Sequence, residues 1–201
     1  MNRSAQRNLF SDLAFGVAGS VVGLLAMRSF WKTVAPDEYR PQGKMSNENA
    51  GTHQSWRSES DPLESISVVG QQHKKEESAT AAMGRIGHHW VVGEDPSDET
   101  RDQLSHGIHW GYGMTMGGVY GAGRGRVGFP DLKGGLLFGV GLWLIGDEMI
   151  VPMLGLQGGP TGATRWQHLH RLGAHLAYGA GLSAATQALM IARDRRRSLS
   201  L

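Results

Sequence analysis

Four segments of the chain have about the length that an α-helix needs to cross a lipid bilayer. About 20 helical residues span the hydrocarbon core. The segments differ in apolar character, the second being only weakly apolar, and they cover residues 10–31, 103–123, 132–154 and 168–191. Because lipid offers backbone groups no hydrogen-bond partner, such segments fold as helices. The sequence therefore predicts an all-α integral membrane protein built as a four-helix bundle.

The first segment has a second reading. Arg3 and Arg7 could be the basic part of a signal peptide, with the segment as its apolar part. No A-x-A cleavage pattern follows the apolar run, however. The sequence therefore favours an uncleaved helix.

Glycine is frequent, and its placement favours closely packed helices. The chain has 30 glycines and 7 prolines in 201 residues, and the glycines crowd into residues 107–181 among apolar neighbours. Glycine in an apolar helix lets a second backbone approach closely. The glycines predicted to line helix contacts are Gly19, Gly23, Gly113, Gly117, Gly121, Gly135 and Gly139.

Basic residues near the segment ends orient the predicted bundle. If four helices cross, these residues all fall on one side, which should be cytoplasmic. Residues 1–9 and the basic tail 192–201 would then both be cytoplasmic, and no nucleic-acid-binding signature accompanies the tail. The basic residues are Arg3, Arg7, Arg124, Arg126, Lys133, Arg193, Arg195, Arg196 and Arg197.

The polar segment 32–102 is predicted to be a long external loop, partly disordered. Within it, residues 78–92 could form a short helix at the membrane interface. Asp95 and Pro96, followed by Ser97 and two acids, indicate that the next helix begins before residue 103, with the proline at its first position.

Two pairs of matching sequences indicate an internal repeat. LAFGVAGSVVG (13–23) matches LLFGVGLWLIG (136–146), and HWGYG (109–113) matches HLAYG (175–179). The matches come in the same order in both halves. This order predicts two duplicated helical hairpins related by an axis along the membrane normal.

Ionisable residues within the apolar segments are candidates for a functional site. Charged groups in a membrane are tolerated where they face the bundle interior and find partners. Estimated depths along ideal helices bring His109, Glu148 and His175 to a similar level. The full predicted proton or metal cluster is His109, Asp147, Glu148, His175, His106 and His168.

Several chemistries fit this cluster. Imidazole and carboxylate suit a divalent metal, for which His109, Glu148 and His175 are the predicted ligands. A proton-responsive site fits equally, because histidine titrates near neutrality. Paired histidines could also ligate a haem or a chlorophyll, and a purely structural hydrogen-bonded network remains open. The chain has no cysteine, which excludes thiolate ligands and disulfides.

The assembled pattern resembles the YagU family of bacterial inner-membrane proteins. The resemblance covers most of residues 100–190, and it implies a polytopic protein of the bacterial inner membrane, without known biochemical activity, linked to survival in acid. The adjacent acids Asp147 and Glu148 depart from the pattern, in which a histidine is expected nearby. The matching positions are His109, Tyr120, Pro130, Gly134, Gly135, Pro152, Gly155, Leu156, His175 and Leu176.

Together these observations predict a small, non-enzymatic inner-membrane protein of acid or envelope stress. Its intramembrane His and carboxylate cluster would respond to protons or bind a metal. The alternative is an accessory structural subunit of a larger, energy-transducing membrane complex that ligates a haem or a chlorophyll. The expected partners are membrane lipids, a second copy of the chain or the larger complex.

Overall fold

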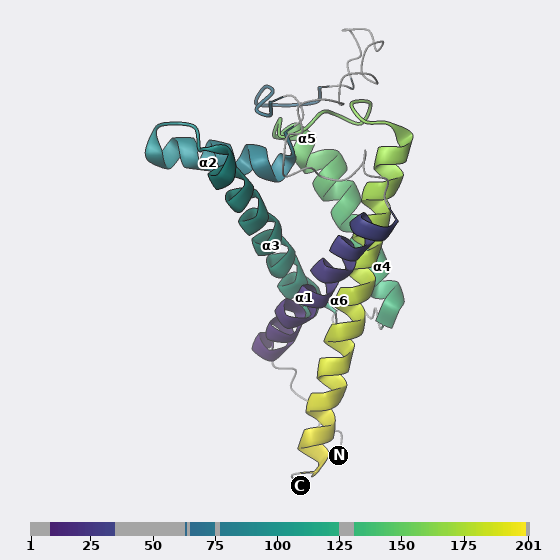
Figure 1. The fold of residues 1–201 in the computed structure, drawn as a ribbon. Helices are drawn as coiled ribbons and strands as arrows, with labels where there is room; N and C mark the ends of the chain where they lie inside the picture. Colours follow the sequence, from purple (N-terminus) through teal and green to yellow (C-terminus); the bar gives the residue numbers. More distant parts are fainter. Residues whose placement is uncertain (1–8, 35–62, 64, 75–76, 125–130, 200–201) are drawn as a thin grey trace. The chain divides into compact units, whose positions relative to one another are not determined.

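The computed structural model describes residues 9–34, 63, 65–74, 77–124 and 131–199. Within these ranges every regular element is a helix and there is no strand, which confirms the all-α prediction (Figure 1). Arg3, Arg7, Arg126 and Pro130 lie outside the described residues. The elements are α1 (Leu9–Thr33), α2 (Ala79–Val92), α3 (Asp98–Gly123), α4 (Asp131–Gly141), the π-helix η2 (Leu142–Ile150), α5 (Val151–Met153) and α6 (Arg165–Leu199).

Two helical stretches are long and apolar enough to cross a membrane. They are Leu9–Thr33 and Leu132–Met153, the latter formed by α4, η2 and α5 in succession. A signal sequence or a buried helix of a soluble protein can have the same composition as the first stretch. Only 11% of the most apolar window of the second stretch is buried, however. Such exposure is not typical of a core helix in a soluble protein.

The other two predicted spans are helical but do not reach the same apolar character. Residues 103–123 fall in α3 and residues 168–191 in α6. Glycine and polar side chains such as His106, Thr115 and Gln187 lower their hydropathy. The four-helix membrane bundle is therefore only partly supported, by two candidate spans among the described residues.

The chain divides into two compact units. Unit 1 comprises residues 1–36, 110–143 and 170–201, and unit 2 comprises residues 37–109 and 144–169. In unit 1 the core contains Leu24, Tyr178 and Leu182, which come from α1 and α6.

Glycine sits where α1 and α3 cross in unit 1. A Cβ placed on Gly16 would overlap the carbonyl oxygen of Gly117 and would lie 2.9 Å from the Cα of Gly121. A Cβ on Gly117 would lie 2.7 Å from the carbonyl oxygen of Gly16. The obstacle on each side is backbone, which cannot rotate away. The two helices can therefore approach this closely only without side chains at these positions.

Glycine also faces the backbone of another helix at two further crossings of unit 1. A Cβ on Gly23 of α1 would lie 2.8 Å from the carbonyl oxygen of Tyr178 in α6. On α4, a Cβ at Gly135 would overlap the carbonyl oxygen of Gly179, and one at Gly139 would overlap that of His175. The remaining predicted packing glycines also meet close neighbours, namely Gly19 beside Thr186, Gly113 beside Leu24 and Gly121 beside Asp12.

The two copies of the proposed repeat contact each other in unit 1. The Thr186 hydroxyl, in the second copy, donates to the Phe15 carbonyl in the first copy at 3.5 Å. The rings of Tyr120, in the first copy, and Phe138, in the second copy, lie 5.2 Å apart. The two contacts differ in kind, and the duplication stays a prediction.

A buried acid in α1 is neutralised by an arginine of α6. Asp12 is only 4% exposed, and Arg193 Nη1 lies 3.5 Å from its Oδ1 and donates to Ser11 Oγ at 3.0 Å. The guanidinium also lies over the ring of Phe15, 5.3 Å from its centre. The predicted tail 192–201 is thus helical to Leu199, and its first arginine is part of the packing.

Unit 2 contains the helix that the sequence predicted at residues 78–92. Ser78 caps α2 by accepting from Ala81 N at 3.2 Å, and the helix packs on α3, where a Cβ on Gly84 would lie 2.9 Å from Leu104 Cβ. The next helix, α3, does begin before residue 103, with Ser97 accepting from Thr100 N. Pro96 precedes this cap instead of opening the helix.

A buried ion pair fixes the start of α2. Arg85 Nε and Nη2 donate to the two carboxylate oxygens of Glu77 at 2.9 and 2.8 Å, and the two side chains are only 12% and 5% exposed. Burial by itself would raise the pKa of Glu77. The hydrogen bonds from Arg85 and from the Lys74 backbone, with the charges of Arg85 and Arg101, outweigh burial and hold that pKa below its usual range.

We expect Gly16→Ala to destabilise unit 1 by about 1–3 kcal/mol, because the added Cβ meets backbone that cannot move aside. The matched control is Gly111→Ala in α3, where a Cβ finds no atom within 4 Å. This control should gain up to about 1 kcal/mol of helix stability. Thermal unfolding of the detergent-solubilised protein measures both, and equal melting temperatures for the two variants would show that the crossing does not require glycine.

We expect the stability of α2 to depend less on acid pH in Glu77→Gln than in the wild type. Because the pKa of Glu77 is lowered on folding, the ion pair stabilises unit 2 above the ordinary carboxyl value of 4.5. This contribution is lost as the pH falls through the lower, folded pKa. At neutral pH the variant should lose about 3–5 kcal/mol, the usual cost of breaking a buried pair.

Hydrogen exchange of residues 79–92 at neutral and acid pH measures this effect. The control is Asp98→Asn, which removes the pair that the exposed Asp98 makes with Arg101 and should cost less than about 1 kcal/mol. Equal losses of protection in Glu77→Gln and Asp98→Asn would show that the Glu77–Arg85 pair does not stabilise α2 more than an ordinary surface pair does.

Candidate functional site

The two acids that stand out in the sequence lie on a π-helix. Asp147 and Glu148 fall in η2, which is nine residues long. Most π-helices are single-turn insertions, and they occur frequently at functional sites. In the π pattern, the donor to the Asp147 carbonyl would be the N–H of residue 152, which is a proline. Gln157 supplies a donor, because its side-chain amide donates to this carbonyl at 2.6 Å.

A capping box places His168 in the first turn of α6. Thr164 Oγ1 accepts from the backbone N–H of Gln167 at 3.3 Å, and the Gln167 side chain accepts from the backbone N–H of Thr164 at 2.7 Å. This reciprocal arrangement is a stable helix start. The backbone N–H of His168 then donates to the Thr164 carbonyl, which fixes the helix at this residue.

The imidazole of His168 is held between two oxygens. Its Nδ1 lies 2.7 Å from Glu148 Oε1, and its Nε2 lies 3.0 Å from the carbonyl oxygen of Pro160. The side chains of Glu148 and His168 are 11% and 20% exposed. The pair is therefore largely removed from water, and in such surroundings an unpaired charge is costly.

The two oxygens beside His168 limit where the hydrogens of its ring can lie. The Pro160 carbonyl can only accept, so Nε2 must carry a hydrogen. The hydrogen between Nδ1 and Oε1 of Glu148 is then bonded either to Nδ1 or to the carboxyl oxygen. An imidazolium with a carboxylate and an imidazole with a carboxylic acid each contain one proton between the two groups. The distances thus fit a hydrogen bond from Nε2 to Pro160 together with one hydrogen between Nδ1 and Oε1.

The other predicted cluster residues are placed differently. His106 and His175 each donate from Nδ1 to a carbonyl one turn earlier in their own helix, at 2.8 Å to Asp102 and 2.9 Å to Arg171. His109 is exposed. Of the predicted set, the structure thus brings together Glu148 and His168.

No metal site is formed by the described residues. Among them, no group of three or more His, Asp or Glu side chains could hold a metal ion. The metal site predicted at His109, Glu148 and His175 therefore has no counterpart in the described part of the chain. We accordingly propose no metal at this position.

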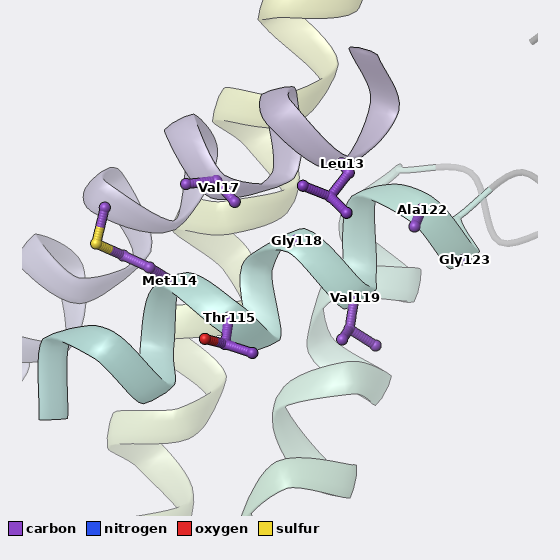
Figure 2. Close-up of a pocket in the computed structure, with 8 residues that line it drawn as sticks. All are labelled: Leu13, Val17, Met114, Thr115, Gly118, Val119, Ala122 and Gly123. Carbon is purple, nitrogen blue, oxygen red and sulfur yellow. The ribbon is translucent and has the colours of Figure 1, made fainter. Parts of the chain in front are cut away.

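An apolar groove lies between α1 and α3 in unit 1 (Figure 2). Its only polar side chain is that of Thr115, whose hydroxyl already donates to the Gly111 carbonyl at 2.8 Å. The groove therefore offers contact surface and no reactive group. It is lined by Leu13, Val17, Met114, Thr115, Gly118, Val119, Ala122 and Gly123.

Comparison with protein families, with curated proteins and with solved structures finds no match to this chain. The function must therefore be argued from the site itself. The similarity to the YagU family stays a prediction.

We expect neutral His168 and neutral His106 to carry their ring hydrogen on different nitrogens. Because Pro160 accepts from Nε2, neutral His168 should be the Nε2–H tautomer, whereas His106 donates from Nδ1 and should be the Nδ1–H tautomer. Nitrogen NMR of ¹⁵N-histidine-labelled protein, assigned with His168→Ala and His106→Ala, distinguishes the two forms. An Nδ1–H signal alone at His168 would contradict the geometry.

Proposed function

We propose that this chain is a small, non-enzymatic helical protein of the bacterial inner membrane that responds to proton concentration through Glu148 and His168. The observation that carries the proposal is the pair itself, in which His168 Nδ1 lies 2.7 Å from Glu148 Oε1 while Nε2 lies 3.0 Å from the Pro160 carbonyl oxygen. A link to acid or envelope stress follows the resemblance described above.

Membrane location rests on outward-facing apolar surface. A soluble protein rarely leaves a long apolar helix uncovered. The second candidate span exposes a row of large apolar side chains, and lipid would cover them. In unit 1, α3 and α6 pack along α1 through glycine contacts, so a bilayer around α1 would also surround them. We therefore include α3 and α6 as spans in the proposal. The exposed residues are Leu132, Leu137, Leu144, Ile145, Met149 and Ile150.

Orientation rests on the basic residues at one end of unit 1. Arg193 near the end of α6 pairs with Asp12 near the start of α1. Arg124, at the end of α3, donates to Met190 Sδ at 3.3 Å. The basic ends of these helices therefore gather on one side, which the positive-inside rule assigns to the cytoplasm. Both termini of the chain would then be cytoplasmic.

The proton response follows from the fixed tautomer of His168. If the pair loses its proton while Pro160 keeps the hydrogen on Nε2, the ring lone pair on Nδ1 faces the carboxylate of Glu148. Two acceptors at this distance repel each other, so the contact should open. Acid therefore closes the contact and alkali releases it. The opening would free the loop of residues 155–164 from the π-helix.

Other ionisable groups lie near the pair in sequence. Asp147 precedes Glu148 on η2, and Arg165, His170 and Arg171 flank His168 on α6.

The groove between α1 and α3 favours a second candidate function, that of an accessory subunit in a larger complex. Its apolar lining would accept another helix in the bilayer. We prefer the proton-responsive proposal because Glu148 and His168 form a defined chemical site, whereas the groove has no reactive group.

We expect residues 155–164 to lose protection from hydrogen exchange as the pH rises. Loss of a hydrogen bond to a charged group, worth about 1.5–3 kcal/mol, corresponds to roughly ten- to hundredfold faster exchange after correction for intrinsic rates. In Glu148→Gln the amide can donate to Nδ1 without any bound proton. Protection in this variant should therefore not depend on pH.

His106→Ala provides the control, because His106 bonds only its own helix among the contacts described above, and it should keep the wild-type profile. The same pH profile in wild type and Glu148→Gln would show that the pair is not the proton-responsive group.

A further inference from the structure

Large apolar side chains stand exposed in the polar part of unit 2. Val68 and Val69 are 71% and 55% exposed, and Trp90 and Val91 at the end of α2 are 84% and 86% exposed. Single exposed apolar residues are ordinary in soluble proteins, but adjacent large ones indicate a contact surface. Both groups fall within the segment 32–102, which is otherwise polar.

Residues 65–73, here called the strap, are fixed to the end of a candidate membrane span. The Val68 backbone N–H donates to the Met153 carbonyl at 3.0 Å, and Ser67 Oγ donates to the same oxygen at 3.3 Å. Further along, the backbone N–H groups of Gln72 and His73 donate to the Gly155 carbonyl at 2.9 and 3.0 Å. The strap thus supplies donors to carbonyls just where the helix ends.

Glycine at residue 155 makes this contact possible. Gly155 has φ +67°, a left-handed conformation that side chains disfavour. A Cβ there would overlap the carbonyl oxygen of Gly70 and would lie 2.9 Å from Ser67 Oγ. The turn after the span therefore has both the backbone conformation and the open space that receive the strap.

The contact fixes the depth of the strap if Leu132–Met153 crosses the bilayer. Met153 is the last residue of that stretch, so its carbonyl lies near the membrane surface. Val68 is one hydrogen bond away from it. The interfacial layer, about 5–10 Å thick, accepts apolar side chains of surface segments. The side chains of Val68 and Val69 therefore fall at the level of this layer.

Arg85, in the middle of α2, joins this helix to the strap. Its Nη2 donates to the Gln72 carbonyl at 2.6 Å as well as to Glu77. Trp90 has the amphipathic ring that concentrates at membrane interfaces.

We propose that the strap and the end of α2 form an anchor in the membrane interface, with Val68, Val69, Trp90 and Val91 inserted among lipid headgroups. The lipid surface is the favoured occupant because the strap is continuous with the exit of an apolar span. The anchor rests on the proposed membrane location. It does not depend on the proton response of Glu148 and His168.

The absence of cysteine from the sequence permits a direct test with single-cysteine variants. The full-length protein is placed in phosphatidylethanolamine and phosphatidylglycerol vesicles, and an environment-sensitive fluorophore is attached in Val68→Cys or Trp90→Cys. The matched control is Gln71→Cys, an exposed polar position in the strap. Leu137→Cys, an exposed position within the span, reports membrane location itself.

For the anchor, labels at 68 and 90 should be quenched by lipids that carry a quencher near the headgroup, at least about twofold more than the label at 71. If the label at 137 is quenched while the labels at 68, 71 and 90 are equally and weakly quenched, the proposed anchor is wrong. The membrane location of the span would then still hold. No quenching at 137 would overturn the membrane location. Labels at 68 and 90 that are shielded from aqueous iodide but not quenched by lipid would indicate a second copy or another protein there, and would also overturn the anchor.

Discussion

Backbone-to-backbone contact at the glycine crossings is the constraint on which unit 1 depends. The carbonyl oxygen of Gly117 occupies the space that a Cβ of Gly16 would need, and Gly135 and Gly179 share the same relation. If unit 1 lies in lipid as proposed, the hydrophobic effect does not drive its helices together, and close van der Waals packing supplies the stabilisation. The many glycines are thus explained by distance between helices rather than by chain flexibility.

Buried charges in this chain are tolerated because several of them meet a specific partner. Asp12 meets Arg193, Glu77 meets Arg85, and Glu148 meets His168. The first two partners are arginines, which keep their charge at any physiological pH. Histidine is the only partner that changes charge near neutrality. This difference makes Glu148 and His168, rather than the other pairs, the candidate for a response to protons.

The helices were predictable from the sequence, whereas the site was only partly so. Apolar length and glycine spacing predicted α1 and the stretch from α4 to α5, because these signals act locally. The depth estimate that grouped His109, Glu148 and His175 assumed ideal α-helices, and η2 breaks that assumption around Glu148. Gln157 and Pro160 were missed because their contacts depend on a loop path. The capping box of Thr164 and Gln167 could have been recognised in the sequence, and it would have placed His168 in the first turn of α6.

One short loop connects the parts of unit 2 that carry the two proposals. Gly155 accepts the strap, Gln157 donates to the π-helix at Asp147, and Pro160 holds the ring of His168. Leu156 of this loop is buried, and the polar contacts add to its packing in fixing the position of the loop. Release of the ring from Glu148 would remove a restraint on the loop that also receives the strap. A change of protonation at the proposed site would therefore reach the strap through fewer than ten residues of backbone.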